Sequence, residues 1–287
     1  MKKFFAFIAS LILLTLTNCS SQTDYVVTIK TQYGNMVAIL YDETPKHKAN
    51  FIKLAEQGFY NDLLFHRVIQ NFMIQGGDPD SKNAAPGQPL GMGGPGYTVE
   101  AEFNPKFFHE KGALSAARLG DGQNPAKASS GSQFYIVQGT VVTPANIDGL
   151  RIDQVKMNAA FQKFVQDPAN QVVIDSLNQI YMTGDMDAYT RKVYSLVPRL
   201  EKVLGQKIYK EANPDKEKAY TTVGGAPHLD GEYTVFGKVI SGLDVLDKIA
   251  AAPTERERPV EDIRMTVTVE KLSKKKITEL YGYTFAR

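Results

Sequence analysis

The stretch from residue 65 to 78, FHRVIQNFMIQGGD, constrains the fold of this 287-residue chain most strongly. Its apolar and polar residues are arranged as in a β-strand, in which successive side chains point to opposite faces. Arg67, Met73 and Gln75 then share one face, whereas Phe72 breaks the parity. We therefore predict a strand with a local bend or bulge that brings Phe72 beside the other three.

Short strand-like segments surround this stretch. Alternation before and after Gly34 predicts a β-hairpin, and Thr44 with Pro45 predicts the start of a helix that Gly58 ends. The further strand-like segments are residues 97–101, 113–117, 133–137, 233–239 and 263–270. Short strands separated by turns favour a closed barrel, which the last strand would seal by pairing with the first hairpin.

Residues 141–225 differ, because their apolar residues recur at helical spacing. One helix is predicted around Val173 to Tyr181, and another from Tyr189 to Leu204, where Gly205 stops it. Two interpretations stay open for this helical block. Either its helices pack on the barrel, or their apolar stripe contacts bound polypeptide, and exposure of the stripe separates the two.

Composition and short motifs exclude several functions. The net charge of +2 gives no field that favours nucleic acid. The four histidines show no metal-ligand spacing, and no GxSxG hydrolase motif occurs. Residues 91–96 satisfy GxGxxG, but a strand-like segment follows them, so we expect a turn and not a dinucleotide site. No metal or other cofactor is expected.

The N-terminus is typical of an exported protein. Two lysines precede an apolar run over residues 4–16, and Cys19, the only cysteine, follows it. This arrangement resembles the lipobox of bacterial lipoproteins. We expect a signal peptide over 1–18, lipidation of Cys19, a tether over 19–24 and attachment to a membrane of the bacterial cell envelope. A plain signal peptide is the alternative, since Asn18 is bulky for a lipobox.

Three segments in order resemble the cyclophilins, the cyclosporin-type peptidyl-prolyl isomerases: residues 65–78, GSQFYIVQ at 131–138 and LDGEYTVFGKV at 229–239. The resemblance implies a mainly β fold, a closed eight-stranded barrel with capping helices. It covers residues 25–140 and 226–272, and the helical block 141–225 is an insertion into it. Residues 273–287 are expected to form a solvated basic tail.

The resemblance also implies an activity and its site. Rotation about an amide bond faces a barrier of about 18–20 kcal/mol, which a guanidinium beside the twisted prolyl nitrogen can lower. It assigns that role to Arg67, oriented by Gln75. The remaining residues that it implies in substrate binding are Phe72, Met73, Ala117, Arg118, Gln133, Tyr135, Leu229 and Tyr233.

Two positions depart from the best-known members of that family. His228 stands where a tryptophan is common, and Tyr233 stands where a histidine is common. We expect activity to persist and cyclosporin to bind poorly, because these changes alter a wall and not the arginine. His66 is expected to be a structural histidine with its hydrogen bonds satisfied.

The expected partners are proline-containing, extended polypeptides, and the expected task is the folding of exported proteins. A competing interpretation keeps the fold and drops the chemistry. In it the chain is a peptide-binding or chaperone module of the cell envelope that holds clients with the helical insertion.

Overall fold

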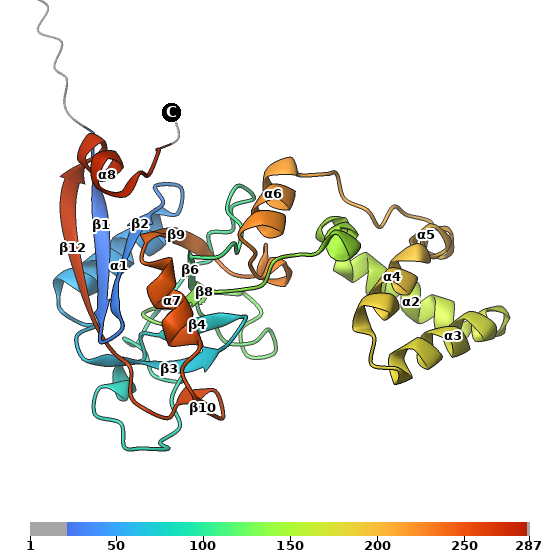
Figure 1. Ribbon diagram of the computed structural model, residues 1–287, viewed down its shortest axis with the longest axis horizontal. Helices are drawn as coiled ribbons and strands as arrows, with labels where there is room; N and C mark the ends of the chain where they lie inside the picture. The colour runs from blue at the N-terminus through green and yellow to red at the C-terminus, as the bar shows by residue number, and fades with distance from the viewer. Residues whose placement is uncertain (1–21, 286–287) are drawn as a thin grey trace, which may run out of the picture.

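The computed structural model describes residues 22–285, in which eight strands close an antiparallel barrel in the order β1-β12-β3-β4-β8-β6-β9-β2 (Figure 1). The strands are β1 Thr23–Thr31, β2 Gly34–Leu40, β3 Leu63–Ile69, β4 Met73–Gly76, β6 Ala113–Ala116, β8 Phe134–Val137, β9 Val235–Ser241 and β12 Arg264–Ser273. The predicted seal is confirmed, because β12 pairs with β1 along residues 266–273.

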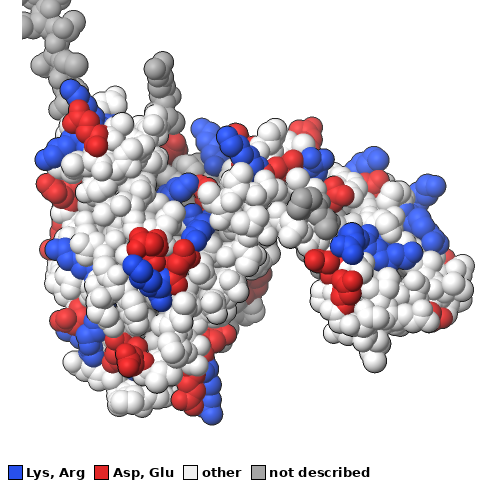
Figure 2. Space-filling view, in the orientation of Figure 1, with Lys and Arg blue, Asp and Glu red and all other residues white. Residues whose placement is uncertain are grey.

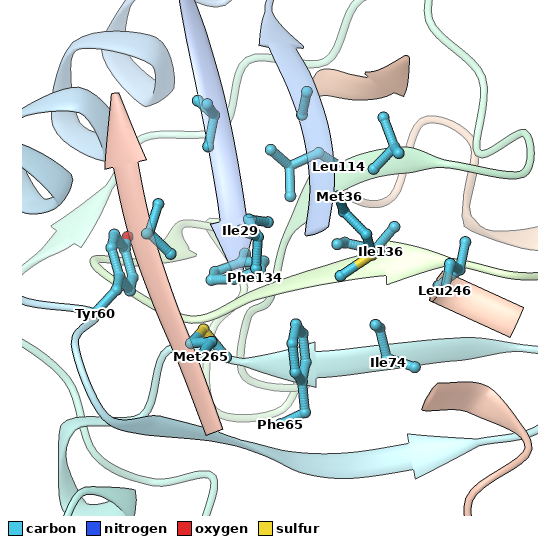
Figure 3. Packing of buried hydrophobic residues seen from close by; sticks show 14 of the residues in the cluster. Ile29, Met36, Tyr60, Phe65, Ile74, Leu114, Phe134, Ile136, Leu246 and Met265 are labelled. Carbon is cyan, nitrogen blue, oxygen red and sulfur yellow. The ribbon is translucent and has the colours of Figure 1, made fainter. Parts of the chain in front are cut away.

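Aromatic and aliphatic side chains fill the barrel interior (Figure 3). The Phe134 ring lies edge-on to the rings of Phe51, Tyr60 and Phe65. Phe51 comes from helix α1 (Pro45–Glu56), and helix α7 (Leu243–Ala250) adds Leu246 to the same core. The barrel is therefore a close-packed solid, and a site can lie only on its outer face.

Residues 65–78 form two strands and not the single bent strand expected from the sequence. β3 and β4 pair as a hairpin whose turn holds Asn71 at a φ of 64°. Asparagine tolerates this left-handed conformation better than most residues, so a tight turn forms where a bend was expected. Arg67 and Gln75 share a face because they are direct cross-strand partners.

Shorter elements lie outside the barrel. The segment expected as a strand at 97–101 contributes only β5 (Thr98–Val99), which pairs with β7 (Ser129–Ser130). Strands β10 (Thr254–Glu255) and β11 (Arg258–Pro259) form a two-stranded hairpin. Two 3-10 turns, η1 (Pro79–Ser81) and η4 (Pro227–Leu229), lie in loops outside the barrel strands.

The helices between β8 and β9 form a lobe beside the barrel (Figure 1). They are the 3-10 turns η2 (Pro144–Arg151) and η3 (Pro168–Asn170), and the α-helices α2 (Gln154–Gln166), α3 (Gln171–Met182), α4 (Met186–Ser195), α5 (Val197–Leu204) and α6 (Pro214–Thr222). The helix expected over 189–204 is broken at Leu196, because Pro198 follows in the first turn of α5 and lacks an amide donor. The sequence analysis had not identified α2 and α6.

The lobe has its own apolar core. Leu196, Val197 and Leu200 are buried against residues of α2 and α3, including Phe164 and Leu177. The predicted apolar stripe is thus neither open to a client nor packed on the barrel. The two ends of the lobe meet at the barrel, where Thr140 and Gly225 exchange backbone hydrogen bonds of 3.2 and 2.9 Å.

The expected basic tail is partly helical. Helix α8 (Lys274–Tyr281) is capped by Ser273, whose side chain accepts a hydrogen bond from the Lys276 amide. Ile277 is fully buried against Val26, Ile39 and their neighbours, so this segment is packed and not solvated as expected. Apolar burial explains the difference, since Ile277 and Tyr281 share one face of a helix.

No helix within residues 22–285 has the length and apolarity to cross a bilayer. The predicted signal peptide and Cys19 lie outside the described residues.

Candidate functional site

A pocket of about 1090 Å³ opens on the outer face of the barrel. Alternation along β4 points Ile74 into the barrel core and Met73 and Gln75 outward. All residues predicted for catalysis or binding line this pocket except Gln133. The fold thus brings together side chains from β3, β4, β8 and two loops that lie far apart in the sequence.

Arg67 lines the pocket together with Gln75 and Glu257. Its Nη1 lies 3.4 Å from Gln75 Oε1, and its Nε donates to Glu257 Oε2 at 2.6 Å. The side chain keeps 39% of its surface exposed, so the guanidinium remains reachable from solvent. Arg67 is held in place on two sides while its remaining N–H groups stay available to a ligand.

Gln133 lies behind Gln75 and not on the pocket surface. Gln75 Nε2 donates to Gln133 Oε1 at 3.0 Å, and Gln133 Nε2 donates to the carbonyls of Gly91 and Gly93 at 2.9 and 2.7 Å. Gln133 is buried, with 5% of its surface exposed. Its side chain therefore orients Gln75, whereas the sequence analysis expected it to contact substrate.

The GxGxxG segment supplies those carbonyls. Residues 91–96 form an irregular loop with no helix after it, which confirms the turn predicted from the sequence. Gly93 is required there, because a Cβ at this position would lie 2.1 Å from Asp78 Oδ1.

The floor of the pocket is apolar. Met73, Tyr135 and Leu229 are buried in one cluster, with Phe72 packed against them. The β3–β4 turn aims Phe72 there, since its carbonyl accepts from the amides of Gln138 and Gly139. Burial also raises the pKa of the Tyr135 phenol, so this wall stays neutral. Such a surface suits a compact apolar ring.

Arg118 and Tyr233 form one side wall. The Arg118 guanidinium lies 4.4 Å from the centre of the Tyr233 ring, and its Nε donates to the Glu232 carbonyl at 2.9 Å. The Tyr233 ring also lies edge-on to Tyr135 at 5.9 Å. These contacts fix Tyr233 in one orientation.

The backbone of Ala117 is already paired within the protein. Its amide donates to the Gln133 carbonyl at 3.0 Å, and its carbonyl accepts from the Ser130 amide at 2.8 Å. The resemblance implies that Ala117 binds substrate, but its amide is not free for main-chain pairing with an extended peptide. Only the second lone pair of its carbonyl could serve.

His66 borders the pocket as a neutral ring. Within the described part of the chain neither of its ring nitrogens has a hydrogen-bond partner, so the expectation of a satisfied histidine is wrong. Burial is the largest cause that lowers the pKa of His66, to about 4. The ring is unprotonated at neutral pH.

Glu257 is the residue that sequence reasoning missed. It lies in the turn between β10 and β11, where Arg256 and Glu257 have φ values of 50° and 68°. The Val68 amide donates to the Glu257 carbonyl at 2.6 Å and fixes this turn beside Arg67. The only signal in the sequence was the run of charged residues at 255–258, which named no partner.

Within residues 22–285 no group of three or more His, Cys, Asp or Glu side chains could hold a metal ion.

The chain matches the family model described as cyclophilin type peptidyl-prolyl cis-trans isomerase/CLD over residues 26–192 and 210–270. These ranges reach into the helical block that the resemblance in the sequence left out. A predicted peptidyl-prolyl cis-trans isomerase of Staphylococcus saprophyticus is 31% identical over 238 residues, which are 81% of this chain and 85% of that protein.

A Streptococcus pyogenes protein named as a predicted bifunctional phosphatase/peptidyl-prolyl cis-trans isomerase is 32% identical over 83% of this chain. The chain spans only 37% of that relative. Among solved structures, a cyclophilin type peptidyl-prolyl cis-trans isomerase of Cryptosporidium parvum has a TM-score of 0.48 at 21% identity, covering 86% of this chain and 98% of that one.

Proposed function

This chain belongs to the cyclophilin-type peptidyl-prolyl cis-trans isomerases, and from that premise we propose that Arg67 accelerates the rotation by stabilising the twisted prolyl amide. The observation that carries the proposal is the place of Arg67. It lies in the same pocket as an apolar floor and is held there by Gln75 and Glu257.

The chemistry follows from the change in the amide during rotation. In the planar ground state the nitrogen lone pair is delocalised into the carbonyl, whereas in the twisted state it can accept a hydrogen bond. A guanidinium N–H placed at that nitrogen therefore stabilises the transition state more than the ground state. The two anchored edges of Arg67 limit its motion, so little reorganisation is needed when the amide twists.

The substrate fits the floor through its proline ring. Phe72, Met73 and Leu229 offer a buried apolar surface on which the ring would lie, with its amide toward Arg67. The Gln75 amide, which donates to Gln133, would contact the adjacent carbonyl. No cofactor takes part in this scheme.

Exchange spectroscopy tests the role of Arg67. Residues 20–287 are compared with the Arg67→Ala and Arg67→Lys variants on an Ala-Pro peptide, with Arg191→Ala as the control at an exposed position of α4. We expect Arg67→Ala to lose roughly 10²–10³-fold in rate, and Arg191→Ala to lose nothing. A folded parent that binds the peptide without accelerating exchange would instead be a non-catalytic binding or chaperone module.

The place of action is a separate part of the proposal. The lysines, the apolar run and Cys19 support a lipid-anchored protein of the bacterial cell envelope that assists exported polypeptides. Uncatalysed prolyl isomerisation takes tens to hundreds of seconds, so a catalyst would speed the folding of exported chains that this step limits. In a bacterial host, Cys19→Ser should move the protein from the membrane fraction to the soluble one. An unchanged distribution would contradict lipidation.

A further inference from the structure

A second pocket, of about 360 Å³, lies where the barrel meets the helical lobe. We propose that it is a subsite for one large apolar side chain of the polypeptide substrate, a few residues from the proline. This inference rests on the proposed function and adds a role for the lobe. The lobe would recognise part of the substrate next to the catalytic pocket.

The barrel side of this junction pocket is aromatic. Phe103, Phe107 and Phe108 line it from the loop after β5. Phe107 is held by stacking on Tyr41 at 3.9 Å between ring centres, whereas Phe103 remains 41% exposed. A large exposed ring on the wall of an open pocket is the type of surface that gains most from covering by an apolar partner.

The lobe supplies the opposite wall. Leu150 and Arg151 come from η2, and Lys216 and Glu217 come from α6. Arg151 donates two hydrogen bonds to the carboxylate of Glu217, at 2.7 and 2.9 Å. Lys216 Nζ lies 2.9 Å from Asp230 Oδ2. Arg151, Glu217, Lys216 and Asp230 are thus compensated in pairs, whereas Lys210 and Glu211, which also line the pocket, are exposed to solvent. The aromatic side of the pocket, where no charge lies among the phenylalanines, is therefore the part that favours an apolar guest.

Tyr233 joins the two pockets. Its side chain lines both the catalytic pocket and the junction pocket, and Arg118 and Tyr135 hold the ring in place. The two pockets therefore share a wall at Tyr233. Because an extended chain advances roughly 3.3 Å per residue, a segment two to four residues from the proline would pass this partition.

The charge pattern on the face drawn in Figure 2 favours a polypeptide over a nucleic acid. Figure 2 shows positive and negative side chains interspersed over this face of both the barrel and the lobe. A nucleic acid would need a continuous basic stripe. A polypeptide already bound by the catalytic pocket is the occupant that the shared wall at Tyr233 favours.

A peptide series tests the subsite. The parent is an alanine-rich peptide with one Ala-Pro bond, and a single phenylalanine is moved from one to five positions away on either side. At one or two spacings we expect the KM for exchange to fall about tenfold with kcat unchanged, as partial burial of a phenylalanine side chain would give.

Two variants locate the effect. Phe103→Ala should abolish the gain and leave exchange of the parent peptide unchanged, whereas Phe103→Tyr should keep it. Tyr181→Ala is the matched control, since Tyr181 is an exposed aromatic residue of the same lobe, 58% exposed, outside the pocket. It should keep the full gain.

Three results would overturn the subsite. If the parent peptide is exchanged and no spacing of phenylalanine lowers the KM, the subsite is wrong and the proposed function stands. A gain that persists in Phe103→Ala also excludes the pocket. If the folded protein exchanges no peptide, the proposed function fails and the subsite fails with it.

Discussion

The barrel and the helical lobe bury their apolar side chains in different ways. The barrel core joins strands from both ends of the chain, since β1 at Thr23–Thr31 pairs with β12 at Arg264–Ser273. The lobe closes its core within residues 152–208. Long-range pairing makes the barrel cooperative, whereas the lobe depends on local contacts. The pocket that contains Arg67 therefore draws its stability from the barrel.

Asp230 is the main polar link between the two regions. Its carboxylate lies 3.0 Å from His109 Nδ1 in the barrel, and Tyr220 of α6 donates to it at 2.7 Å. Burial acts to raise the pKa of Asp230, but the hydrogen bond with His109 and the charge of Lys216 outweigh it and lower the pKa. Asp230 directly follows Leu229, so the link between barrel and lobe is adjacent in sequence to a residue of the pocket floor.

Removing one aromatic ring from each core should give the largest difference between the response of the barrel and that of the lobe. Phe134→Ala in the barrel and Phe164→Ala in the lobe should each cost about 3–5 kcal/mol of local stability, because both side chains are 1% exposed. Amide hydrogen exchange, measured region by region, should show that Phe164→Ala opens the lobe alone. The same variant should still catalyse cis/trans isomerisation of a short peptide. Equal loss of protection in both regions would show that they unfold as one unit.

Breaking the link at Asp230 should have the next largest effect. Asp230→Ala removes the partner of two buried groups and of Lys216, so we expect a loss of about 3 kcal/mol. In heat unfolding of Asp230→Ala the lobe should melt before the barrel, and the two melting temperatures should differ by more than they do in the parent. Asp244→Ala, which breaks an exposed pair with Lys248, is the control and should change little. A single unaltered transition for Asp230→Ala would contradict the link.

Acid should destabilise the barrel through His66. Burial holds the folded pKa at about 4, below the ordinary 6.5, so the unfolded chain takes up a proton first as the pH falls. The stability that the neutral His66 contributes to the folded state is fully present above pH 6.5, and it is lost as the pH falls from 6.5 toward 4. Denaturant titrations at pH 7.5 and 5 should give a loss about 2 kcal/mol smaller in His66→Gln than in the parent. Identical losses would mean that His66 already carries a proton when folded.

The exposed pair between Arg67 and Glu257 should give the smallest change in stability. Glu257→Gln should alter the free energy of unfolding by less than about 0.5 kcal/mol, since both side chains of the pair are well exposed. The exchange rate should fall roughly fivefold, as loss of about 1 kcal/mol of arginine positioning would produce. Lowering the salt concentration should not restore the isomerisation rate of Glu257→Gln. A faster variant would mean that Glu257 masks Arg67 instead of positioning it.

The sequence predicted the parts of the site that lie on regular strands. Alternation and the three resembling segments identified the closed barrel and brought Arg67, Met73 and Tyr135 to one pocket. Two failures came from unused signals. Asn213 and Pro214 mark the start of α6, with the Asn213 side chain as its cap, and Ser273 caps α8 in the same way.

Other features could not be predicted in this way. The pairing of Arg67 with Glu257 joins residues 190 positions apart through a charged turn with two positive φ values, and no periodic pattern specifies such a contact. The position of Gln133 behind Gln75 depends on the path of the loop at Gly91 and Gly93. Both are consequences of loop geometry, which local propensity describes poorly.

The paired hydrogen bonds between Thr140 and Gly225 have a consequence for how such a chain can change over evolutionary time. They hold the entry and the exit of the lobe next to each other, so the chain can leave the barrel and return to it at almost the same place. The entropy cost of closing a loop grows only by about 0.6 kcal/mol for each doubling of its length. The helices that build the lobe core within residues 152–208 can therefore be lengthened, shortened or exchanged, while the link at Asp230 and the position of Arg67 in the barrel stay unchanged.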